Sequence, residues 1–295
     1  MKIIITGAKG QLGSDLVPRL NMAGHEVIGF GSKELDITSA DKTLKAVKDL
    51  SPECIINCGA YTKVDLAEKE KESAFAVNQT GAANLADAAE AAGAALIHVS
   101  TDFVFDGDKA TPYSETDKTN PLSVYGASKL AGEEEIIKRT DKHFIVRTSW
   151  LYGTGGNNFV KTILRLAAER ESLRIVYDQA GSPTWTADLA SALLKIVKSV
   201  ETGEKKYGVY HYSNEGVASW YDFAHMILEE TARRTDLKCR NLEPILTAEY
   251  PTPARRPAYS VFNKSKIKKE FGISIPHWRV SLRGMINELY GGADA

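Results

Sequence analysis

The sequence has almost no net charge and no long apolar run. Its 37 basic and 38 acidic side chains give a formal net charge of −1, which provides no long-range field for a nucleic acid or an anionic membrane. No apolar stretch of about 18 residues is available to cross a bilayer, and the apolar start is too short for a secretory leader. We therefore expect a cytoplasmic protein that binds neither nucleic acid nor membranes.

Cysteine is also scarce. Cys54, Cys58 and Cys239 are an odd number without a C-x-x-C pair, so we expect reduced structural thiols rather than disulfides. The sequence contains no H-E-x-x-H run or Cys/His cluster for zinc and no repeat of 20–50 residues. The 295 residues are long enough for one large or two ordinary domains.

Short β-branched runs instead alternate with helical patterns. Strands are predicted at 2–6, 26–30, 54–57, 94–99 and 144–147, and helices at 12–23, 39–50, 72–92 and 124–139. This alternation is typical of a parallel sheet covered on both faces. We predict an α/β fold, with a Rossmann-type doubly wound parallel sheet over 1–150 for a dinucleotide and a smaller substrate-binding lobe mainly over 151–295. Part of 177–215 is expected to return to the Rossmann sheet.

A glycine-rich turn, Gly7-Ala8-Lys9-Gly10-Gln11-Leu12-Gly13, joins the first predicted strand to the first predicted helix. At such a turn, free backbone N–H groups and the positive end of a helix dipole bind a pyrophosphate. The spacing is G-x-x-G-x-x-G rather than G-x-G-x-x-G, and similar turns also occur as simple tight connections. Its place inside a βαβ unit favours a dinucleotide site.

The end of the second predicted strand bears on the choice of cofactor. It reads Val27-Ile28-Gly29-Phe30-Gly31-Ser32-Lys33 and has no carboxylate there for the ribose 2′-hydroxyl of NAD. Ser32 and Lys33 suit a 2′-phosphate, so we predict NADPH, with NADH as the alternative. Lys33 is nearly as compatible with a solvated loop.

A tyrosine and a lysine, Tyr125 and Lys129, lie four residues apart on the helix predicted over 124–139, and therefore share one face. A nearby ammonium lowers the pKa of a phenol, which lets it exchange a proton with an alkoxide near neutral pH. Most Tyr/Lys pairs at this spacing are only surface neighbours, so the spacing alone is weak evidence for a catalytic pair.

Two predicted strands end in small and polar residues at the edge where doubly wound sheets bind ligands. Thr101 ends the fourth strand, where it can polarise a carbonyl, and the run 57–65 ends the third, where small residues allow a cofactor close to the backbone. Both ends are also compatible with ordinary turns. Together with the glycine-rich turn, they predict one crevice.

These residues resemble the extended short-chain dehydrogenase/reductase family over essentially the whole chain. The segments 101–107, 125–133, 147–152 and 250–257 are similar to signatures of the dTDP-4-dehydrorhamnose reductase family, and the last lies outside the shared cofactor machinery. The resemblance implies an NAD(P)-dependent oxidoreductase of nucleotide-sugar and polysaccharide biosynthesis. Its implied reaction is reduction of the 4-keto group of dTDP-4-dehydro-6-deoxy-L-mannose to dTDP-L-rhamnose.

The resemblance also implies roles by position, beginning with a catalytic triad of Thr101, Tyr125 and Lys129. With the glycine-rich turn, the expected cofactor-binding residues are Gly7, Gly10, Gln11, Leu12, Gly13, Ser32, Lys33, Asp36, Ile37, Gly59, Ala60, Tyr61, Tyr125 and Lys129. The expected substrate-binding residues are Thr62, Val64, Asp65, Thr101, Asp102, Trp150, Asn158 and Arg256, with the nucleotide base near Asp178, Gln179 and Pro183. Trp150 is also compatible with core packing, and Arg256 with a helix cap or solvent.

Some members of this family hold Mg²⁺ at a subunit interface. Asp15 and Glu288 could serve as two of those ligands, but Ala187, beside Asp188, stands at the third acidic position, so the ligand set for Mg²⁺ is incomplete and the metal stays an open alternative to carboxylates that are only solvated. We expect a monomer or a homodimer.

Two alternatives stay open. The first is another nucleotide-sugar reductase, epimerase or dehydratase on the same scaffold, although Phe103 replaces the second acid of a dehydratase Asp-Glu pair after the threonine. The second is a non-catalytic regulatory subunit of a methionine adenosyltransferase, which the intact triad disfavours.

Overall fold

The structure is a computed structural model that describes residues 1–291; residues 292–295, the end of the predicted lobe, lie outside the described residues. Its centre is a six-stranded sheet in the order β10-β5-β4-β3-β1-β2, and all five neighbouring pairs are parallel. The strands are β1 (Lys2–Thr6), β2 (Glu26–Phe30), β3 (Cys54–Asn57), β4 (Ala95–Thr101), β5 (His143–Thr148) and β10 (Gly208–His211). The predicted Rossmann-type fold is confirmed.

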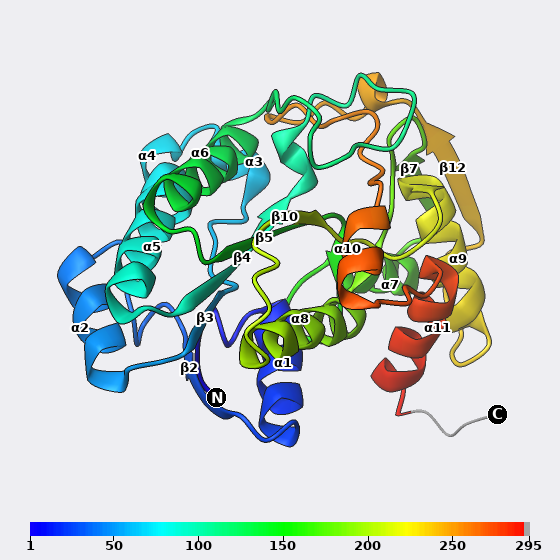
Figure 1. Cartoon of the computed structure of the whole chain (residues 1–295). Helices are drawn as coiled ribbons and strands as arrows, with labels where there is room; N and C mark the ends of the chain where they lie inside the picture. Colours follow the sequence, from blue (N-terminus) through cyan, green and yellow to red (C-terminus); the bar gives the residue numbers. More distant parts are fainter. Residues whose placement is uncertain (292–295) are drawn as a thin grey trace.

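Helices cover both faces of this sheet (Figure 1). On one face lie α1 (Gln11–Met22) and α8 (Thr186–Glu201), and on the other lie α2 (Ala40–Leu50), α5 (Gly81–Ala92) and α6 (Val124–Arg139). Ile3 and Ile5 of β1 pack in the core with Leu16, whereas Ile4 packs in the opposite core with Leu85. Because alternate strand residues enter two different cores, the strands are apolar throughout.

The helix predicted over 72–92 is interrupted. The structure has α4 (Lys71–Phe75), a π-helical turn (Ala76–Thr80) and then α5. Hydrophobic periodicity does not reveal such a turn, because the segment stays apolar and helical on both sides of it. π-Turns of this kind concentrate near functional sites, and this one carries the buried residue Asn78.

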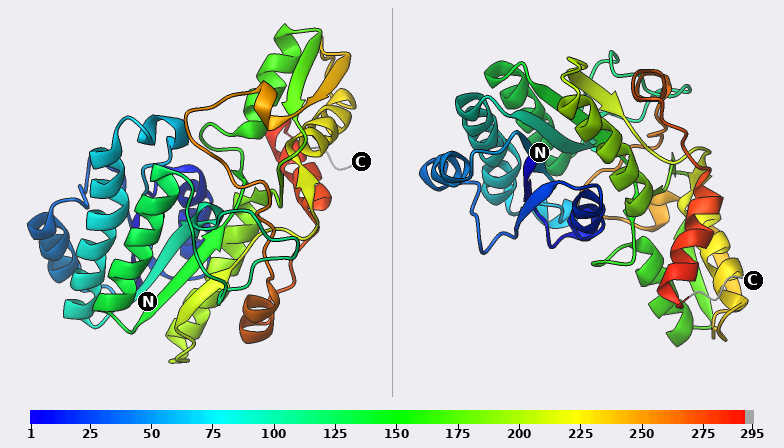
Figure 2. Two further views of the ribbon diagram at one scale, coloured as in Figure 1. Left: turned by 90° about the horizontal axis from the view of Figure 1, so that it is seen from above. Right: turned by 60° about the horizontal axis from the view of Figure 1, so that its bottom comes forward.

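The smaller lobe lies beside the sheet (Figure 2). It has its own core around Phe223 and Trp278. Its elements are α7 (Phe159–Glu169), α9 (Trp220–Ala232), α11 (Trp278–Leu289) and the parallel pair β7 (Ser172–Val176) and β12 (Asn241–Ile245). Short connecting elements are α3 (Val64–Ala67), α10 (Ser265–Phe271), β6 (Leu151–Tyr152) with β9 (Thr184–Trp185), and β8 (Ala180–Gly181) with β11 (Ala218–Ser219).

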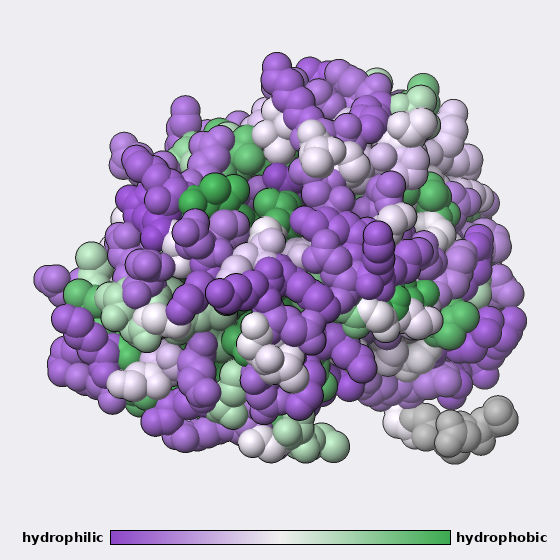
Figure 3. Space-filling view, viewed as in Figure 1, coloured by the Kyte–Doolittle hydropathy of each residue, from purple (hydrophilic) through white to green (hydrophobic). Residues whose placement is uncertain are grey.

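The face of the molecule seen in Figure 3 is mostly polar, with small scattered apolar areas. Within residues 1–291, no helix combines the length and apolar character needed to cross a membrane. All three cysteines are free thiols, as predicted, and burial raises the pKa of the Cys54 thiol to about 12.

Candidate active site

A cleft of about 1060 Å³ runs along the carboxyl ends of β1, β3 and β4. It contains most of the residues that the sequence singled out. The expected cofactor and substrate residues that line it are Gly7, Gly10, Gln11, Leu12, Ser32, Asp36, Ile37, Gly59, Ala60, Tyr61, Thr62, Val64, Thr101, Asp102, Tyr125, Lys129 and Trp150. The structure therefore brings the glycine-rich turn, two further strand ends and the Tyr/Lys helix to one crevice.

The glycine-rich turn is packed too closely for larger residues. Gly7 has a φ of +68°, and a Cβ there would lie 2.6 Å from the backbone of Cys58 and Gly59. A Cβ on Gly13 would lie 2.4 Å from the carbonyl oxygen of Gly7. In the described chain no side chain caps α1, which begins after Gly10, so its first N–H groups are available for a pyrophosphate.

The end of β2 differs from the sequence-based expectation. Lys33 is exposed and lies outside the cleft lining, whereas Lys9 of the glycine-rich turn lines the cleft and pairs with Glu34. The Glu34 carboxylate accepts a hydrogen bond from the backbone N–H of Gly31 at 2.5 Å. A carboxylate is therefore present near the end of β2 after all, because a tight turn folds Glu34 back onto Gly31.

Tyr125 lies in the first turn of α6, which Ser123 caps by accepting a hydrogen bond from the N–H of Gly126 at 3.2 Å. Burial raises the pKa of Tyr125 to about 12, while a hydrogen bond with Thr101 acts in the opposite direction. This differs from the expected lowering by Lys129. The physical reason is that burial of the phenol is the dominant influence on its pKa; the nitrogen of Lys129 donates to the carbonyl oxygen of Val99 at 2.7 Å.

Two buried polar side chains lie at or near the cleft: Asp102 lines it, and Asn78 lies behind its lining. Burial raises the pKa of the Asp102 carboxyl to about 6. Asn78 in the π-turn holds Tyr61 through its backbone N–H and carbonyl, at 2.9 and 3.1 Å, and donates to Ser128 Oγ at 2.9 Å. Asn78 thus fixes the loop after β3 against α6. The position of Asn78 could not be predicted from the sequence, because nothing in an Ala-rich helical pattern marks one asparagine as buried.

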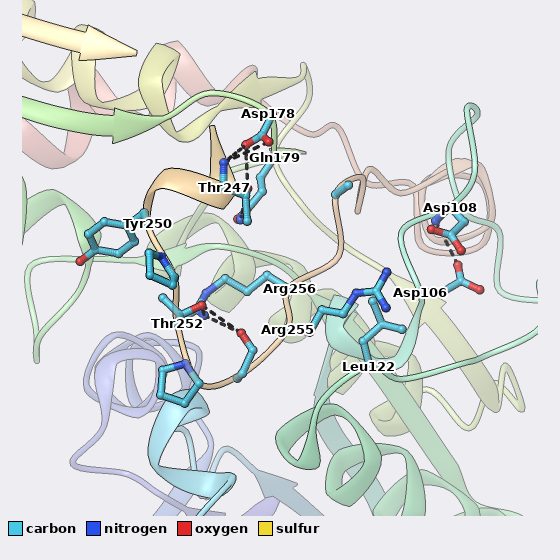
Figure 4. A pocket seen from close by; sticks show the side chains of 14 residues that line it. Asp106, Asp108, Leu122, Asp178, Gln179, Thr247, Tyr250, Thr252, Arg255 and Arg256 are labelled. Atoms are coloured by element: carbon cyan, nitrogen blue, oxygen red, sulfur yellow. Dashed lines mark hydrogen bonds between the residues drawn. The ribbon is translucent and has the colours of Figure 1, made fainter. Parts of the chain in front are cut away.

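A second, smaller pocket of about 390 Å³ lies where the loop 250–257 crosses between the lobe and the sheet domain (Figure 4). Asp178, Gln179, Tyr250 and Arg256 are among its lining residues. Pro183, the third residue expected near the base, is not in this lining. Asp178 accepts from the N–H and hydroxyl of Thr247 at 2.9 and 2.6 Å.

Arg256 and Asp65 join the two parts of the chain. The guanidinium donates two hydrogen bonds to the Asp65 carboxylate, at 3.0 and 2.8 Å, and these lower the pKa of that carboxyl. Arg256 also donates to the Thr252 hydroxyl at 2.6 Å, whereas the side chain of Arg255 points the other way, toward Asp106 (Figure 4). The bidentate pair links α3, beside the cleft, to the loop around the second pocket.

Trp150 and Asn158 occupy different environments. Trp150 has a φ of +48°, lines the cleft and stacks on Trp220 with ring centroids 3.5 Å apart. Such a conformation costs energy in a non-glycine residue and is concentrated at functional sites. Asn158 lies outside the cleft lining, where it caps α7 and donates to Gln11 Oε1 at 3.1 Å, so its contact with a diphosphate stays a prediction.

The acidic residues considered for Mg²⁺ do not form a cluster. Within residues 1–291, no group of three or more His, Cys, Asp or Glu side chains is placed to hold a metal ion. Glu288 is exposed and accepts from the Thr154 hydroxyl at 2.9 Å. Asp188 accepts from Asn214 at 2.7 Å and from Ser281, while Asp15 is half-buried on α1.

Comparison with known proteins gives matches over nearly the whole length. Residues 1–290 match the family described as "RmlD substrate binding domain". The chain is 46% identical over 287 residues to a dTDP-4-dehydrorhamnose reductase of Aggregatibacter actinomycetemcomitans, covering 96% of this chain and 98% of that protein. It is 41% identical over 293 residues to the spore coat polysaccharide biosynthesis protein SpsK of Bacillus subtilis, covering 99% of each.

The fold is likewise similar to solved structures. The crystal structure of dTDP-4-dehydrorhamnose reductase from Bacillus anthracis, in complex with NADP, superposes with a TM-score of 0.91 at 43% identity, covering 97% of this chain and 99% of that one. A Clostridium acetobutylicum dTDP-4-dehydrorhamnose reductase gives a TM-score of 0.92 at 41% identity, covering 98% and 99%.

Proposed function

The chain belongs to the dTDP-4-dehydrorhamnose reductase family and is an NAD(P)-dependent reductase, and from this premise we propose that it reduces the 4-keto group of dTDP-4-dehydro-6-deoxy-L-mannose to dTDP-L-rhamnose. The observation that carries the proposal is that Thr101, Tyr125 and Lys129 line the same cleft as the glycine-rich turn. Two hydroxyl groups that can donate to a substrate oxygen therefore lie in the cleft that the dinucleotide would occupy.

The residues present fit a dinucleotide. The N–H groups at the uncapped start of α1 can donate to a pyrophosphate, and the cleft continues from there to Tyr125 and Lys129. When bound, the reduced nicotinamide supplies a hydride to the carbonyl carbon. NADPH is favoured by Lys9 and Ser32, which line the cleft and would donate to a 2′-phosphate, and by the NADP complex of the Bacillus anthracis relative.

Tyr125 is the proton donor of the proposed reaction. With its pKa raised to about 12, the phenol keeps its proton throughout the neutral range, which is the state needed to protonate a developing alkoxide. The Thr101 hydroxyl donates a hydrogen bond to the same oxygen and holds the carbonyl in line with the phenol. Lys129, about one helical turn after Tyr125 on α6 and also in the cleft lining, would hold the nicotinamide ribose.

The substrate nucleotide would extend from this point to the second pocket. Val64, Asp65 and Trp150 would border the sugar, and Arg256 would bind the diphosphate, because a guanidinium fork matches phosphate oxygens. In the free protein Arg256 is held by Asp65, so substrate binding exchanges one anionic partner for another. Asp178 and Gln179 would meet the base.

The experiment is to incubate the purified protein with freshly generated dTDP-4-dehydro-6-deoxy-L-mannose and NADPH, follow absorbance at 340 nm, and identify the product by NMR. We expect dTDP-L-rhamnose, and a ratio of kcat/KM values for NADPH over NADH above one. UDP- and GDP-linked keto sugars run in parallel test the nucleotide. Absence of oxidation with the dTDP sugar, in a protein that binds NADPH, would overturn the proposal.

A second candidate is reduction of a different nucleotide-linked keto sugar. The specific observation is the 41% identity to SpsK, a protein of spore coat polysaccharide biosynthesis. Faster turnover of another keto sugar in the same assay would favour it.

A further inference from the structure

A chain of side-chain contacts connects the second pocket with the wall of the cleft. In the second pocket, Asp178 accepts a hydrogen bond from the Thr247 hydroxyl at 2.6 Å, and the Thr247 oxygen lies 3.0 Å from Gln179 Nε2 (Figure 4). The side-chain oxygen of Gln179 lies 3.1 Å from Trp220 Nε1. The ring of Trp220 stacks on Trp150, which lines the cleft. The proposed reaction makes no use of Trp220 or of its contact with Gln179.

The direction of each hydrogen bond follows from the indole group. A tryptophan N–H can only donate, so the Gln179 atom that faces Trp220 is the amide oxygen, and the NH₂ group faces Thr247. The Thr247 hydroxyl gives its own proton to the carboxylate of Asp178, so the Thr247 oxygen can accept from Gln179. The side chain of Gln179 is only 6% exposed, and water is therefore a poor substitute for either of its partners.

The stack of Trp150 on Trp220 depends on the groups around it. The two rings are nearly parallel, at 4°, with centroids 3.5 Å apart, whereas aromatic pairs prefer offset or edge-to-face arrangements with wider separation. The φ of +48° at Trp150 is a strained conformation that persists only where the surroundings hold it. Gly181 packs so closely that a Cβ there would lie 2.5 Å from the Trp150 ring. Packing restrains the ring faces, and the directional hydrogen bond to Gln179 fixes how Trp220 is turned within its plane.

We propose that Gln179 is a positioning residue: anchored by Thr247, it holds Trp220 and, through the stack, sets the position of Trp150 in the cleft. The inference rests on the proposed function for its link to catalysis, because Trp150 borders the sugar in the proposed reaction. The reacting carbonyl must be aligned with Tyr125 and with the hydride donor. A small displacement of the Trp150 wall therefore lowers the rate of the chemical step more than it weakens binding.

The place of Gln179 in the lining of the second pocket links the two ends of the substrate. A side-chain amide has two N–H donors and two acceptor lone pairs. Trp220 and Thr247 use one of each, so one N–H and one lone pair of Gln179 remain for a nucleotide base. Thr247 begins the 3₁₀ turn Thr247–Glu249, which leads directly into the loop 250–257 with Arg256. Binding of the nucleotide and positioning of the sugar thus share one side chain.

The test compares Gln179→Met with the wild-type full chain. Methionine keeps the length of the glutamine side chain and removes both hydrogen bonds. The first readout is ¹H–¹⁵N NMR of the indole groups in the protein without ligand, with Trp220→Phe and Trp150→Phe identifying the two signals. We expect the Trp220 signal to move and its proton to exchange with water about tenfold faster, the effect of losing one hydrogen bond. The Trp150 signal should move with it, because the position of the neighbouring ring changes.

Steady-state kinetics with dTDP-4-dehydro-6-deoxy-L-mannose provide the second readout. In Gln179→Met, kcat should fall by about tenfold or more through misalignment of the sugar, while substrate KM and the Kd of NADPH change little. We express kcat per NADPH-binding site, so partial unfolding does not imitate this result. Gln179→Glu keeps an oxygen that accepts from the Trp220 N–H, and it should return both indole signals and most of kcat toward the wild-type values.

Glu230→Met is the matched control. Glu230 lies on α9, the same helix as Trp220, is only 4% exposed and pairs with Arg283 of α11 at 2.8 Å. Its substitution removes a polar partner from the same lobe without touching the stack. We expect lower stability in urea unfolding, with the Trp150 and Trp220 signals and the kcat per site unchanged.

The inference is overturned by an unmoved Trp150 signal or an unchanged kcat per site in Gln179→Met, or by an equal movement of the Trp150 signal in Glu230→Met. Because the NMR comparison needs no substrate, the two proposals fail separately. A Trp150 signal that moves in Gln179→Met, when the wild type does not turn over the dTDP sugar, overturns only the proposed function. Turnover by the wild type with an unmoved Trp150 signal in Gln179→Met overturns only this inference.

Discussion

At the scale of single residues, burial sets how tightly the acidic side chains of the cleft hold their protons. Tyr125 and Asp102 both have raised pKa values, and in each case burial is the main cause. The sequence predicted Tyr125, Lys129 and Thr101 correctly as cleft residues, because their spacing and strand-end position are local properties. It did not predict their protonation, since burial depends on packing by distant segments of the chain.

Replacing Tyr125 with phenylalanine removes the proposed proton donor and keeps the ring. We expect kcat to fall by about a hundredfold or more, the usual size of a general acid contribution, while the Kd of NADPH stays nearly the same. Steady-state kinetics and fluorescence titration measure the two quantities. Near-normal turnover would remove Tyr125 from the mechanism.

Asp102 should make stability depend on pH. Its pKa is about 6 in the folded protein against a reference value of 3.8, so the folded state binds this proton more tightly. The stabilisation is fully present below pH 3.8 and is lost as the pH rises through about 6. Asp102→Asn should therefore gain stability relative to wild type across this window, by about 3 kcal/mol at neutral pH, as measured by urea unfolding.

Asp106 provides the control for this pH dependence. A hydrogen bond from Tyr113 lowers the pKa of its carboxyl, so Asp106→Asn should lose stability relative to wild type as the pH rises. If the stability difference from wild type changes with pH in the same direction for Asp102→Asn and Asp106→Asn, the raised pKa of buried Asp102 does not explain its effect on stability.

At the scale of elements, the strands and α6 could be predicted because their signals lie within the segments themselves. The predicted and observed bounds agree for β1, β2, β3 and α6. The π-turn around Asn78 and the turn that brings Glu34 back to Gly31 could not be predicted. Asn78 is held by a hydrogen bond to Ser128 on α6 and Glu34 by one from the Gly31 N–H, and hydrophobic periodicity gives no sign of either contact.

The junction of β1 and α1 tests whether the glycine-rich turn depends on close packing. A methyl group on Gly13 would lie 2.4 Å from the Gly7 carbonyl oxygen, so Gly13→Ala should displace the turn. We expect the Kd of NADPH to rise at least tenfold and stability to fall by about 1–3 kcal/mol. Ser14→Ala, at the next and exposed position of α1, should change neither; equal effects in both variants would contradict the account.

At the scale of the whole molecule, the fold depends on contacts between residues far apart in the sequence. Arg256 and Asp65 are 191 positions apart, and the parallel pairing of β7 with β12 joins segments 69 residues apart. Single-sequence patterns give no register for such contacts. The sequence therefore predicted Arg256 and Asp65 separately as substrate residues, without indicating that they bind each other in the free protein.

Arg256→Ala should weaken substrate binding and leave cofactor binding unchanged. We expect substrate KM to rise by about tenfold or more, the usual cost of losing a charge-assisted hydrogen bond, with the Kd of NADPH unchanged. Arg174→Ala, which removes an exposed ion pair with Glu249 in the lobe, serves as the matched control. Equal loss of cofactor and substrate binding in Arg256→Ala would indicate misfolding rather than a lost contact.

The most direct measurement of the central claim follows the hydride itself. NADPH deuterated at the nicotinamide C4, in separate 4R and 4S forms, is incubated with dTDP-4-dehydro-6-deoxy-L-mannose, and the product is examined by NMR. The account predicts dTDP-L-rhamnose carrying deuterium at C4 of the sugar from one of the two forms. Product without deuterium from either form, or with deuterium at another carbon, would contradict it.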